Sequence, residues 1–321
     1  MRVAFCGVFA ATIEPRVRSY LTLPCEVIRC DEAGMAAQLG DVDVLVTLGF
    51  TREMAAAATR LKLVQVPGAG LDRIERAAIP AGAWLANVYG HEIGIAEYVV
   101  GAMLALTREY ARLDAALRRG AWDSQWAVGA PAPPPWPELA GKTLGILGYG
   151  HIGEAVARRA RAFAMEVVAI RRHVAGPPDG LATVLAPAML DDVLRHSDYV
   201  VVTLPLSTET RGLLDRRRLR SMKSSAMLVN VSRAEIVDED ALYGALAEKR
   251  LAGAALDVWY RYPTAPGATL PARRPFHELS NVIMTPHLSG WTEGMLDARA
   301  KVIAENVART ARGEPPLNLI R

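Results

Sequence analysis

Three glycines, Gly148, Gly150 and Gly153, have the spacing G-x-G-x-x-G within the sequence LGILGYGHIG. The pattern follows an apolar run and opens a helical stretch, Glu154–Ala164, which is the context of a dinucleotide-binding turn. Gly148 permits the tight turn, Gly150 lets the main chain approach a pyrophosphate, and Gly153 allows helix and strand to pack closely. The start of a helix also attracts anions. The pattern therefore predicts a dinucleotide site; the alternative is a glycine turn with only a structural role.

The residues after the next predicted strand indicate which nicotinamide dinucleotide would bind. A site for NAD places an acidic residue there, on the ribose 2′-hydroxyl. This chain instead continues Ile170-Arg171-Arg172-His173. Two guanidinium groups suit a 2′-phosphate, and no carboxylate is present to bind a free diol. We predict NADP(H) in preference to NAD(H); the alternative is that one or both arginines are solvated surface charges.

An arginine and a histidine further along the chain have the chemistry to act on a small anion. Arg233 follows a predicted strand, and a guanidinium can bind a carboxylate through two hydrogen bonds while polarising an adjacent carbonyl. His287 follows Thr-Pro, and an imidazole titrates near neutrality, so it can give and take a proton. Neither signal is specific by itself, because both residue types are common at such places.

Alternating strands and helices would position these residues in two parallel α/β regions. In the first region the predicted strands are Arg2–Phe9, Cys25–Cys30, Val42–Leu48 and Leu61–Val66, with helices at Asp31–Leu39 and Glu53–Arg60. In the second the predicted strands are Thr143–Leu147, Glu166–Ile170, Tyr199–Thr203, Ala226–Val231, Ala254–Val258 and Val282–Thr285. Six strands with crossovers match a doubly wound dinucleotide-binding domain.

The segment between the two regions reads as a long helix followed by an irregular connection. Helical periodicity runs from about Gly94 to Arg119 and stops at Gly120, a natural helix end. The stretch Ala127–Pro137 is rich in proline, which excludes a regular helix or a central strand. We expect an exposed connection there.

Composition limits the classes of protein that need to be considered. The 321 residues are 51% hydrophobic and 22% charged, which predicts one large or two ordinary folded domains. The formal net charge of +3 predicts neither a nucleic-acid nor a membrane partner. Three cysteines without metal-ligand spacing favour no metal site and a reducing cytoplasm.

The chain resembles the D-isomer-specific 2-hydroxyacid dehydrogenase family from about residue 40 to residue 316. Four stretches carry the resemblance: VPGAGLDRI (66–74), GYGHIG (148–153), LVNVSRAEIVDEDAL (228–242) and NVIMTPHLSGWT (281–292). The resemblance implies two Rossmann-like α/β domains with doubly wound parallel sheets. A cofactor domain, residues 98–287, would be inserted in a discontinuous substrate domain, residues 1–97 plus 288–321, with the active site in the cleft between them. It also implies a homodimer formed through the cofactor domains.

The resemblance implies NADPH-dependent reduction of a 2-keto acid to a D-2-hydroxy acid. Arg233 matches the family's catalytic arginine and His287 its acid/base histidine. The expected substrate-binding residues are Gly68, Ala69 and Gly70, through main-chain N–H groups, and His91 and Glu92. The expected cofactor-binding residues are Gly148, Tyr149, Gly150, His151, Ile152, Gly153, Arg171, Arg172, Leu204, Pro205, Val231, Ser232, Asp257 and Ser289.

One catalytic position departs from the family pattern. The family pairs the histidine with a glutamate just before a proline, five residues after the acid that Asp257 matches; here that position is Tyr262. Because a glutamate stabilises imidazolium, we predict a lower pKa for His287 than in relatives that keep it. Tyr262 could still orient the ring, and Glu92 is a hypothetical replacement carboxylate.

The missing glutamate leaves two other functions open. One is a dehydrogenase of another small anion, such as formate or phosphite, for which the proton step matters less. The other is a nucleotide-sensing protein with little turnover, similar to the C-terminal-binding-protein corepressors.

Overall fold

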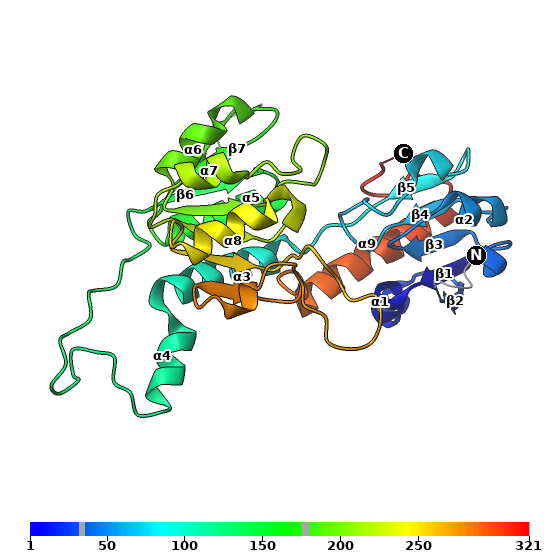
Figure 1. Cartoon of the computed structure of the whole chain (residues 1–321). Coiled ribbons are helices and arrows are strands. Elements are labelled where there is room, and N and C mark those ends of the chain that lie inside the picture. The colour runs from blue at the N-terminus through cyan, green and yellow to red at the C-terminus, as the bar shows by residue number, and fades with distance from the viewer. Residues whose placement is uncertain (32–35, 175–179, 321) are drawn as a thin grey trace. The chain divides into compact units, whose positions relative to one another are not determined.

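A computed structural model describes residues 1–31, 36–174 and 180–320. The chain divides into two compact units, each a parallel α/β structure (Figure 1). Unit 1 comprises Met1–His91 and Trp291–Arg321, and unit 2 comprises Glu92–Gly290. The predicted fold class, with two doubly wound parallel sheets, is confirmed.

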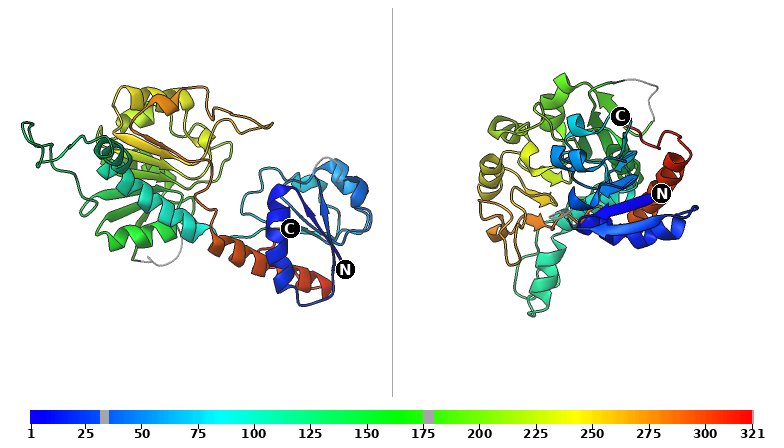
Figure 2. Two further views of the ribbon diagram at one scale, coloured as in Figure 1. Left: turned by 90° about the horizontal axis from the view of Figure 1, so that it is seen from below. Right: turned by 90° about the vertical axis from the view of Figure 1, so that its right-hand side faces the viewer.

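Unit 1 is built on a parallel sheet in the order β2-β1-β3-β4-β5. Its strands are β1 Arg2–Cys6, β2 Glu26–Cys30, β3 Val44–Thr47, β4 Leu63–Gln65 and β5 Trp84–Ala86. Helices α1 (Val8–Tyr20) and α9 (Glu293–Ala311) lie side by side and pack on one face through an apolar cluster (Figure 2). The opposite face packs against α2 (Arg52–Ala57) and the 3₁₀ turns η2 (Ala36–Gln38) and η3 (Arg76–Ala78).

Unit 2 has a longer parallel sheet in the order β12-β11-β10-β9-β6-β7-β8. Its strands are β6 Thr143–Leu147, β7 Glu166–Ile170, β8 Thr183–Leu185, β9 Tyr199–Val202, β10 Met227–Asn230, β11 Gly253–Leu256 and β12 Val282–Met284. The order of the strands switches between β6 and β9: β7 and β8 lie on one side of β6, and β9 to β12 lie on the other. Ligands bind at such switch points in open α/β sheets.

Helices cover both faces of the unit 2 sheet. One face packs against α3 (Glu92–Arg108) and α5 (His151–Ala162). The other packs against α6 (Leu190–His196), α7 (Arg216–Ser221) and α8 (Glu239–Ala247). The remaining elements are α4 (Tyr110–Leu117) and the 3₁₀ turns η4 (Pro187–Met189), η5 (Ala234–Ile236) and η6 (Phe276–Glu278).

The predicted first strand, Arg2–Phe9, is too long, and the helix that follows it was not predicted. The strand ends at Cys6 because Gly7 turns the chain at φ 87°, and α1 then begins at Val8. Pro15 lies inside this helix and obscures it in the sequence.

The predicted helix from Gly94 to Arg119 is two helices. Glu109 has a left-handed conformation, φ 48°, which ends α3 and starts α4 in a new direction. The three-residue strands β5 and β8 were missed. The exposed connection over residues 127–137 is confirmed. Of the predicted helix Asp31–Leu39, residues 32–35 lie outside the described residues, and Ala36–Gln38 forms a 3₁₀ turn.

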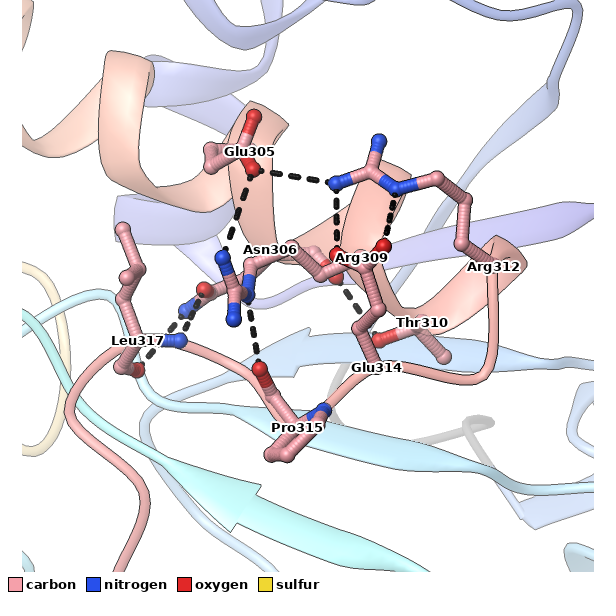
Figure 3. A network of polar contacts seen from close by, with 8 residues as sticks. All are labelled: Glu305, Asn306, Arg309, Thr310, Arg312, Glu314, Pro315 and Leu317. Atoms are coloured by element: carbon pink, nitrogen blue, oxygen red, sulfur yellow. Dashed lines mark hydrogen bonds and ion pairs between the residues drawn. The ribbon is translucent and has the colours of Figure 1, made fainter.

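Buried polar side chains tie the C-terminal half of α9 to the rest of unit 1 (Figure 3). The fully buried Asn306 donates from Nδ2 to Gln65 Oε1 (2.7 Å) and to the Leu317 carbonyl (3.1 Å). Its Oδ1 accepts from the Leu317 N–H at 2.6 Å. One turn later, the Arg309 Nε donates to the Pro315 carbonyl at 2.7 Å. The last turns of α9 and the tail of the chain are therefore held together as one piece.

Two classes of feature are not found in the part of the chain that the structure describes. No helix there has both the length and the apolar character needed to span a membrane. Within the same residues, no group of three or more His, Cys, Asp or Glu side chains is arranged to hold a metal ion.

Candidate functional site

The predicted glycine turn connects β6 to α5 at the switch point of unit 2. Gly148 has φ 108°, and the main-chain N–H groups of Gly148 and Tyr149 both donate to the Ile170 carbonyl, at 3.1 and 3.0 Å. The Thr203 hydroxyl, at the end of β9, donates to the Gly148 carbonyl at 2.6 Å. Contacts from the two neighbouring strands thus fix the shape of the turn.

Each glycine of the motif has a different reason to lack a side chain. A Cβ at Gly148 would lie 2.8 Å from the Leu204 nitrogen, and one at Gly153 would lie 2.6 Å from the Gly148 carbonyl oxygen. A Cβ at Gly150, by contrast, would meet no atom within 4 Å. Packing therefore requires the first and third glycines, whereas the space beside the second is open to a ligand.

The start of α5 is suited to an anion. Gly150 is the N-cap residue, and Glu154 is the first residue whose N–H bonds back to the Gly150 carbonyl, at 2.8 Å. The N–H groups of Ile152 and Gly153 come before that bond and have no acceptor within the helix. These groups fit the pyrophosphate of a dinucleotide. The Tyr149 side chain is buried in the core, so it supports the turn from the protein side.

Arg171 and Arg172 are exposed immediately after β7. The Arg171 main chain donates to the Leu185 carbonyl at 3.0 Å, so the unpredicted strand β8 fixes the point at which the arginines leave the sheet. The Arg172 guanidinium lies 3.8 Å from the Glu209 carboxylate, and both side chains are exposed. The two arginines are therefore accessible to a ligand at the predicted place.

Three successive carbonyls in the loop after β4 each accept a hydrogen bond from another part of unit 1. The carbonyls of Pro67, Gly68 and Ala69 accept, respectively, from Arg299 Nη1 (3.1 Å), the Val88 N–H (3.2 Å) and Asn87 Nδ2 (3.0 Å). In a trans peptide the N–H points away from the C=O. The N–H groups of Gly68, Ala69 and Gly70 therefore each point away from the donor that holds the carbonyl of the same peptide.

These three N–H groups have the chemistry to bind an anion. Among the residues that the structure describes, none of them has a hydrogen-bond acceptor. Successive main-chain N–H groups that point to one side make a concave site for an anion. We call the N–H groups of Gly68, Ala69 and Gly70 the amide cradle.

In unit 2, Tyr262 contacts the histidine that was predicted to be catalytic. The Tyr262 hydroxyl lies 2.8 Å from His287 Nδ1, and the Trp259 N–H donates to the same hydroxyl oxygen at 3.4 Å. The nitrogen that a family glutamate would contact is thus already bonded. The hypothesis that Glu92 replaces the carboxylate stays a prediction; Glu92 is the first residue of α3.

The loop that carries His287 is held by a buried carboxylate. Asp257 is fully buried; its Oδ1 accepts from the Thr285 hydroxyl (2.6 Å) and the Leu288 N–H (2.9 Å), and its Oδ2 from the Ser289 N–H (2.8 Å). His287 itself has φ 59°, a conformation that costs energy for a residue with a side chain. The three bonds to Asp257 hold the strained residue in place.

Two further residues, Tyr98 and Trp259, hold the same loop and were not predicted to do so. The Tyr98 hydroxyl lies 2.8 Å from Thr285 Oγ1, and the Trp259 Nε1 donates to the Thr285 carbonyl at 2.8 Å. Burial raises the pKa of Tyr98 to about 12, so its hydroxyl stays protonated. Their sequence signals are weak, because buried aromatic residues are usually only part of a core.

Arg233 follows β10 and affects the protonation of both His287 and Tyr262. Partial burial lowers the pKa of His287; the charge of Asp257 opposes this shift and that of Arg233 adds to it. Burial raises the pKa of Tyr262, although the Trp259 N–H and Arg233 oppose the rise. The pair is therefore a neutral phenol beside an imidazole that does not readily accept a proton.

The other predicted cofactor residues lie at the carboxyl ends of β9 and β10. The Ser232 hydroxyl donates to the Leu204 carbonyl, and this bond connects the two strand ends. Pro205, next to Leu204, is exposed, whereas Val231 is buried. His91 is half-buried at the end of unit 1, just before α3.

Residues 100–289 match the family described as D-isomer specific 2-hydroxyacid dehydrogenase, NAD binding domain. The chain belongs to the D-isomer-specific 2-hydroxyacid dehydrogenase family. The match covers the family's NAD-binding domain, so this 2-hydroxyacid dehydrogenase family member is a nicotinamide-dependent oxidoreductase.

Relatives in sequence and solved structures agree with this assignment. The chain is 35% identical to the glyoxylate reductase of Thermococcus kodakarensis over 87% of its own length and 83% of the relative. It is 34% identical to the D-3-phosphoglycerate dehydrogenase of Methanocaldococcus jannaschii over 88% of its own length, and spans about half (52%) of that relative. Among solved structures, the 2-hydroxyacid dehydrogenase of Ketogulonicigenium vulgare Y25 superposes with a TM-score of 0.80 at 29% identity, covering 100% of this chain and 98% of the other.

Alanine substitutions in the turn would distinguish a glycine that is needed for cofactor binding from a glycine that is needed for packing. Gly150→Ala should leave the free energy of unfolding within about 0.5 kcal/mol, because its Cβ meets no atom. It should weaken cofactor binding about tenfold or more if the main chain contacts the pyrophosphate there. Gly153→Ala should lower the free energy of unfolding by about 1–3 kcal/mol through overpacking.

Denaturant titration and fluorescence titration with cofactor measure the two effects. Gly244→Ala is the matched control, because its Cβ lies in open space on α8. It should not change the Kd of the cofactor. An unchanged Kd in Gly150→Ala would contradict the assignment of the open space to the cofactor.

Proposed function

We propose that the protein reduces a 2-keto acid to a D-2-hydroxy acid and prefers NADPH. The observation that carries this proposal is the amide cradle. Its three N–H groups fit a carboxylate, since each carbonyl of the same peptides is already bonded on the other side. Unit 1 would thus be the substrate domain and unit 2 the cofactor domain. A cytoplasmic location is part of the proposal, in keeping with three cysteines that are all free thiols.

In the proposed reaction, Arg233 binds the substrate carboxylate and polarises the adjacent carbonyl. A guanidinium keeps its charge at every relevant pH and can make two parallel hydrogen bonds. When it is bound, the reduced nicotinamide supplies the hydride to the carbonyl carbon. His287 then protonates the carbonyl oxygen from Nε2.

Tyr262 orients His287 in both protonation states of the ring. When the imidazole is neutral, a hydroxyl that donates to Nδ1 leaves the hydrogen on Nε2. When the ring is charged, Nδ1–H donates to the phenol oxygen instead. Unlike a carboxylate, the phenol adds no negative charge, so it keeps the ring's orientation without raising its pKa.

The preference for NADPH is supported by the position of Arg171 and Arg172. Both side chains are exposed just after β7, where a 2′-phosphate would lie, and no acidic residue follows that strand directly. The ion pair of Arg172 with Glu209 is long and exposed, so it would hardly compete with a phosphate dianion.

A second candidate is oxidation of another small anion, such as formate or phosphite. The contact between Tyr262 and His287 favours it, because this pair is less able to supply a proton than a histidine paired with glutamate. Reactions in which the protein gives no proton to the substrate would tolerate that replacement.

We also propose a homodimer formed through unit 2. Helix α4 and the segment after it extend away from the sheet of unit 2 (Figure 1). This arm exposes large apolar side chains: Tyr110, Leu117, Trp122, Trp126 and Val128. Such a group on a surface is typical of an association site.

Sedimentation equilibrium of the wild-type protein should give twice the mass of the chain. The double variant Trp122→Glu, Trp126→Glu should give the mass of a monomer. A monomeric wild type would contradict the proposal.

A panel of substrates tests the proposed reaction. Glyoxylate, hydroxypyruvate and bulkier 2-keto acids would each be incubated with NADPH and, in parallel, with NADH, while formate and phosphite are tested with the oxidised cofactors. Turnover of a 2-keto acid supports the reductase, and turnover of formate or phosphite alone supports the second candidate. Cofactor binding without any turnover would instead favour a nucleotide sensor.

Removing the two arginines should abolish the preference for NADPH. In the double variant Arg171→Ser, Arg172→Ser we expect kcat/KM with NADPH to fall roughly 10- to 100-fold, which corresponds to lost charged hydrogen bonds. The value with NADH should change little. Arg158→Ser, at an exposed position on α5, is the control and should leave both values unchanged. A double variant that still prefers NADPH would refute the assignment.

Installing the family's glutamate should extend activity to higher pH. The reduction needs a protonated His287, so kcat/KM falls as pH rises through its pKa. A carboxylate beside the ring stabilises imidazolium, and Tyr262→Glu should therefore move the falling limb up by about one pH unit or more. Tyr262→Phe, which keeps the ring but lacks the hydroxyl, should not move it upward. Identical limbs in wild type and Tyr262→Glu would show that Tyr262 does not set this pKa.

A further inference from the structure

Arg299 is a buried charged residue in unit 1 that the motifs did not identify. It lies on α9 and is only 8% exposed, and its guanidinium carbon lies 5.8 Å from the centre of the Phe9 ring. Its Nη1 donates to the Pro67 carbonyl at 3.1 Å and its Nε to the Tyr89 carbonyl at 3.2 Å. One side chain thus bonds to two loops at the carboxyl ends of neighbouring strands.

The first of these bonds sets the direction of an N–H group in the amide cradle. The Pro67 carbonyl and the Gly68 N–H belong to the same peptide group, and in a trans peptide they point in opposite directions. Because Arg299 holds the carbonyl, the N–H is turned away from α9. Val88 and Asn87 hold the next two carbonyls in the same way, but both of these donors are neutral.

The second bond holds the segment that leads into α3. Gly90, next to Tyr89, has φ 97°, and a Cβ there would lie 3.0 Å from Ala298 Cβ and 3.9 Å from Arg299 Cγ. This segment therefore packs directly on α9 at Arg299. The Arg299 guanidinium thus holds both this segment and the loop that carries the amide cradle, and it fixes their positions relative to each other.

The charge of Arg299 has a consequence beyond positioning. Burying a guanidinium costs free energy, since it loses its water. Arginine remains charged at every working pH. A positive charge therefore lies on the protein side of the Pro67 carbonyl, on the other side of the peptide from the Gly68 N–H. In a poorly hydrated region such a charge attracts an anion more strongly than it would in water.

We propose that Arg299 is a positioning residue that makes the amide cradle selective for negatively charged substrates. Its guanidinium aligns the Gly68 N–H and adds positive potential without touching the substrate. The proposal rests on the proposed function only in taking a carboxylate as the anion that the cradle binds.

The main test compares charge and shape at position 299. The variants are Arg299→Gln, which keeps donors but loses the charge, and Arg299→Lys, which keeps the charge but loses the planar fork. Arg309→Met is the matched control, because Arg309 lies on the same helix and also donates to a proline carbonyl, that of Pro315 (Figure 3). For each protein the measurements are the Kd of oxamate with NADPH bound, the Kd of NADPH, and the unfolding midpoint.

We expect Arg299→Gln to raise the Kd of oxamate about 10- to 100-fold, because the variant removes the positive charge behind the amide cradle. Arg299→Lys should raise it severalfold. The Kd of NADPH should be unchanged in both variants, because the proposed cofactor site lies in unit 2. Arg309→Met should change only the unfolding midpoint. With glyoxylate as substrate, KM should rise in Arg299→Gln while kcat changes less than about threefold. The rise should be smaller for uncharged methyl glyoxylate.

Several outcomes would overturn the inference. One is a folded Arg299→Gln protein with an unchanged Kd for oxamate; another is an equal rise of KM for glyoxylate and its methyl ester, which would indicate a structural role only. If Arg299→Gln does not fold, an unchanged oxamate Kd in a folded Arg299→Lys protein would overturn it as well. Oxamate binding needs no turnover, so the absence of 2-keto acid reduction would refute the proposed function while still testing Arg299.

Discussion

Main-chain groups at the carboxyl ends of buried parallel strands need hydrogen-bond partners, and the candidate site depends on how this need is met. Where a strand ends, the ladder of the sheet can no longer satisfy the main-chain carbonyls and N–H groups. In this protein other groups take over: Thr203 bonds the glycine turn, Arg299 bonds the loop after β4, and Asp257 bonds the loop after β12. The loops are therefore ordered from the protein side.

The same arrangement leaves N–H groups directed outward. In the amide cradle the carbonyls are occupied, so the opposite ends of the peptides are available to an anion. At the start of α5 the helix geometry achieves the same result without side chains. In the proposed function the first group of N–H donors binds a carboxylate and the second binds a pyrophosphate.

Tyr262, at the position where the family resemblance predicts a glutamate, would separate two tasks that a carboxylate performs together. A carboxylate orients the imidazole and also raises its pKa. The Tyr262 hydroxyl contacts Nδ1 and can orient the ring, but it brings no charge. His287 is instead positioned by its strained main chain, which the buried Asp257 holds. The Tyr262 contact can therefore hold the ring without adding a negative charge that would raise its pKa.

The amino-acid sequence alone was sufficient for the features that depend on local patterns. Apolar runs of five residues, such as β6 and β7, were predicted with the observed bounds, and the glycine spacing placed the turn between β6 and α5. Two of the three-residue strands, β5 and β8, were not recognised, and neither was α1 with its internal proline. The break at Glu109 requires a left-handed conformation that no residue pattern announced.

The roles of Arg299, Tyr98 and Asp257 depended on tertiary structure. Arg299 is more than 200 residues from Pro67 in sequence, with a separation of 232, and Asp257 is 31 residues from Leu288. No periodicity relates such residues, because their contacts arise only when α9 packs on the sheet of unit 1 and when β11 pairs with β12. The sequence determined which side chains could act on an anion or a proton; the tertiary structure decided which of them hold the loops, because hydrogen bonds between distant segments form only after the sheets have assembled.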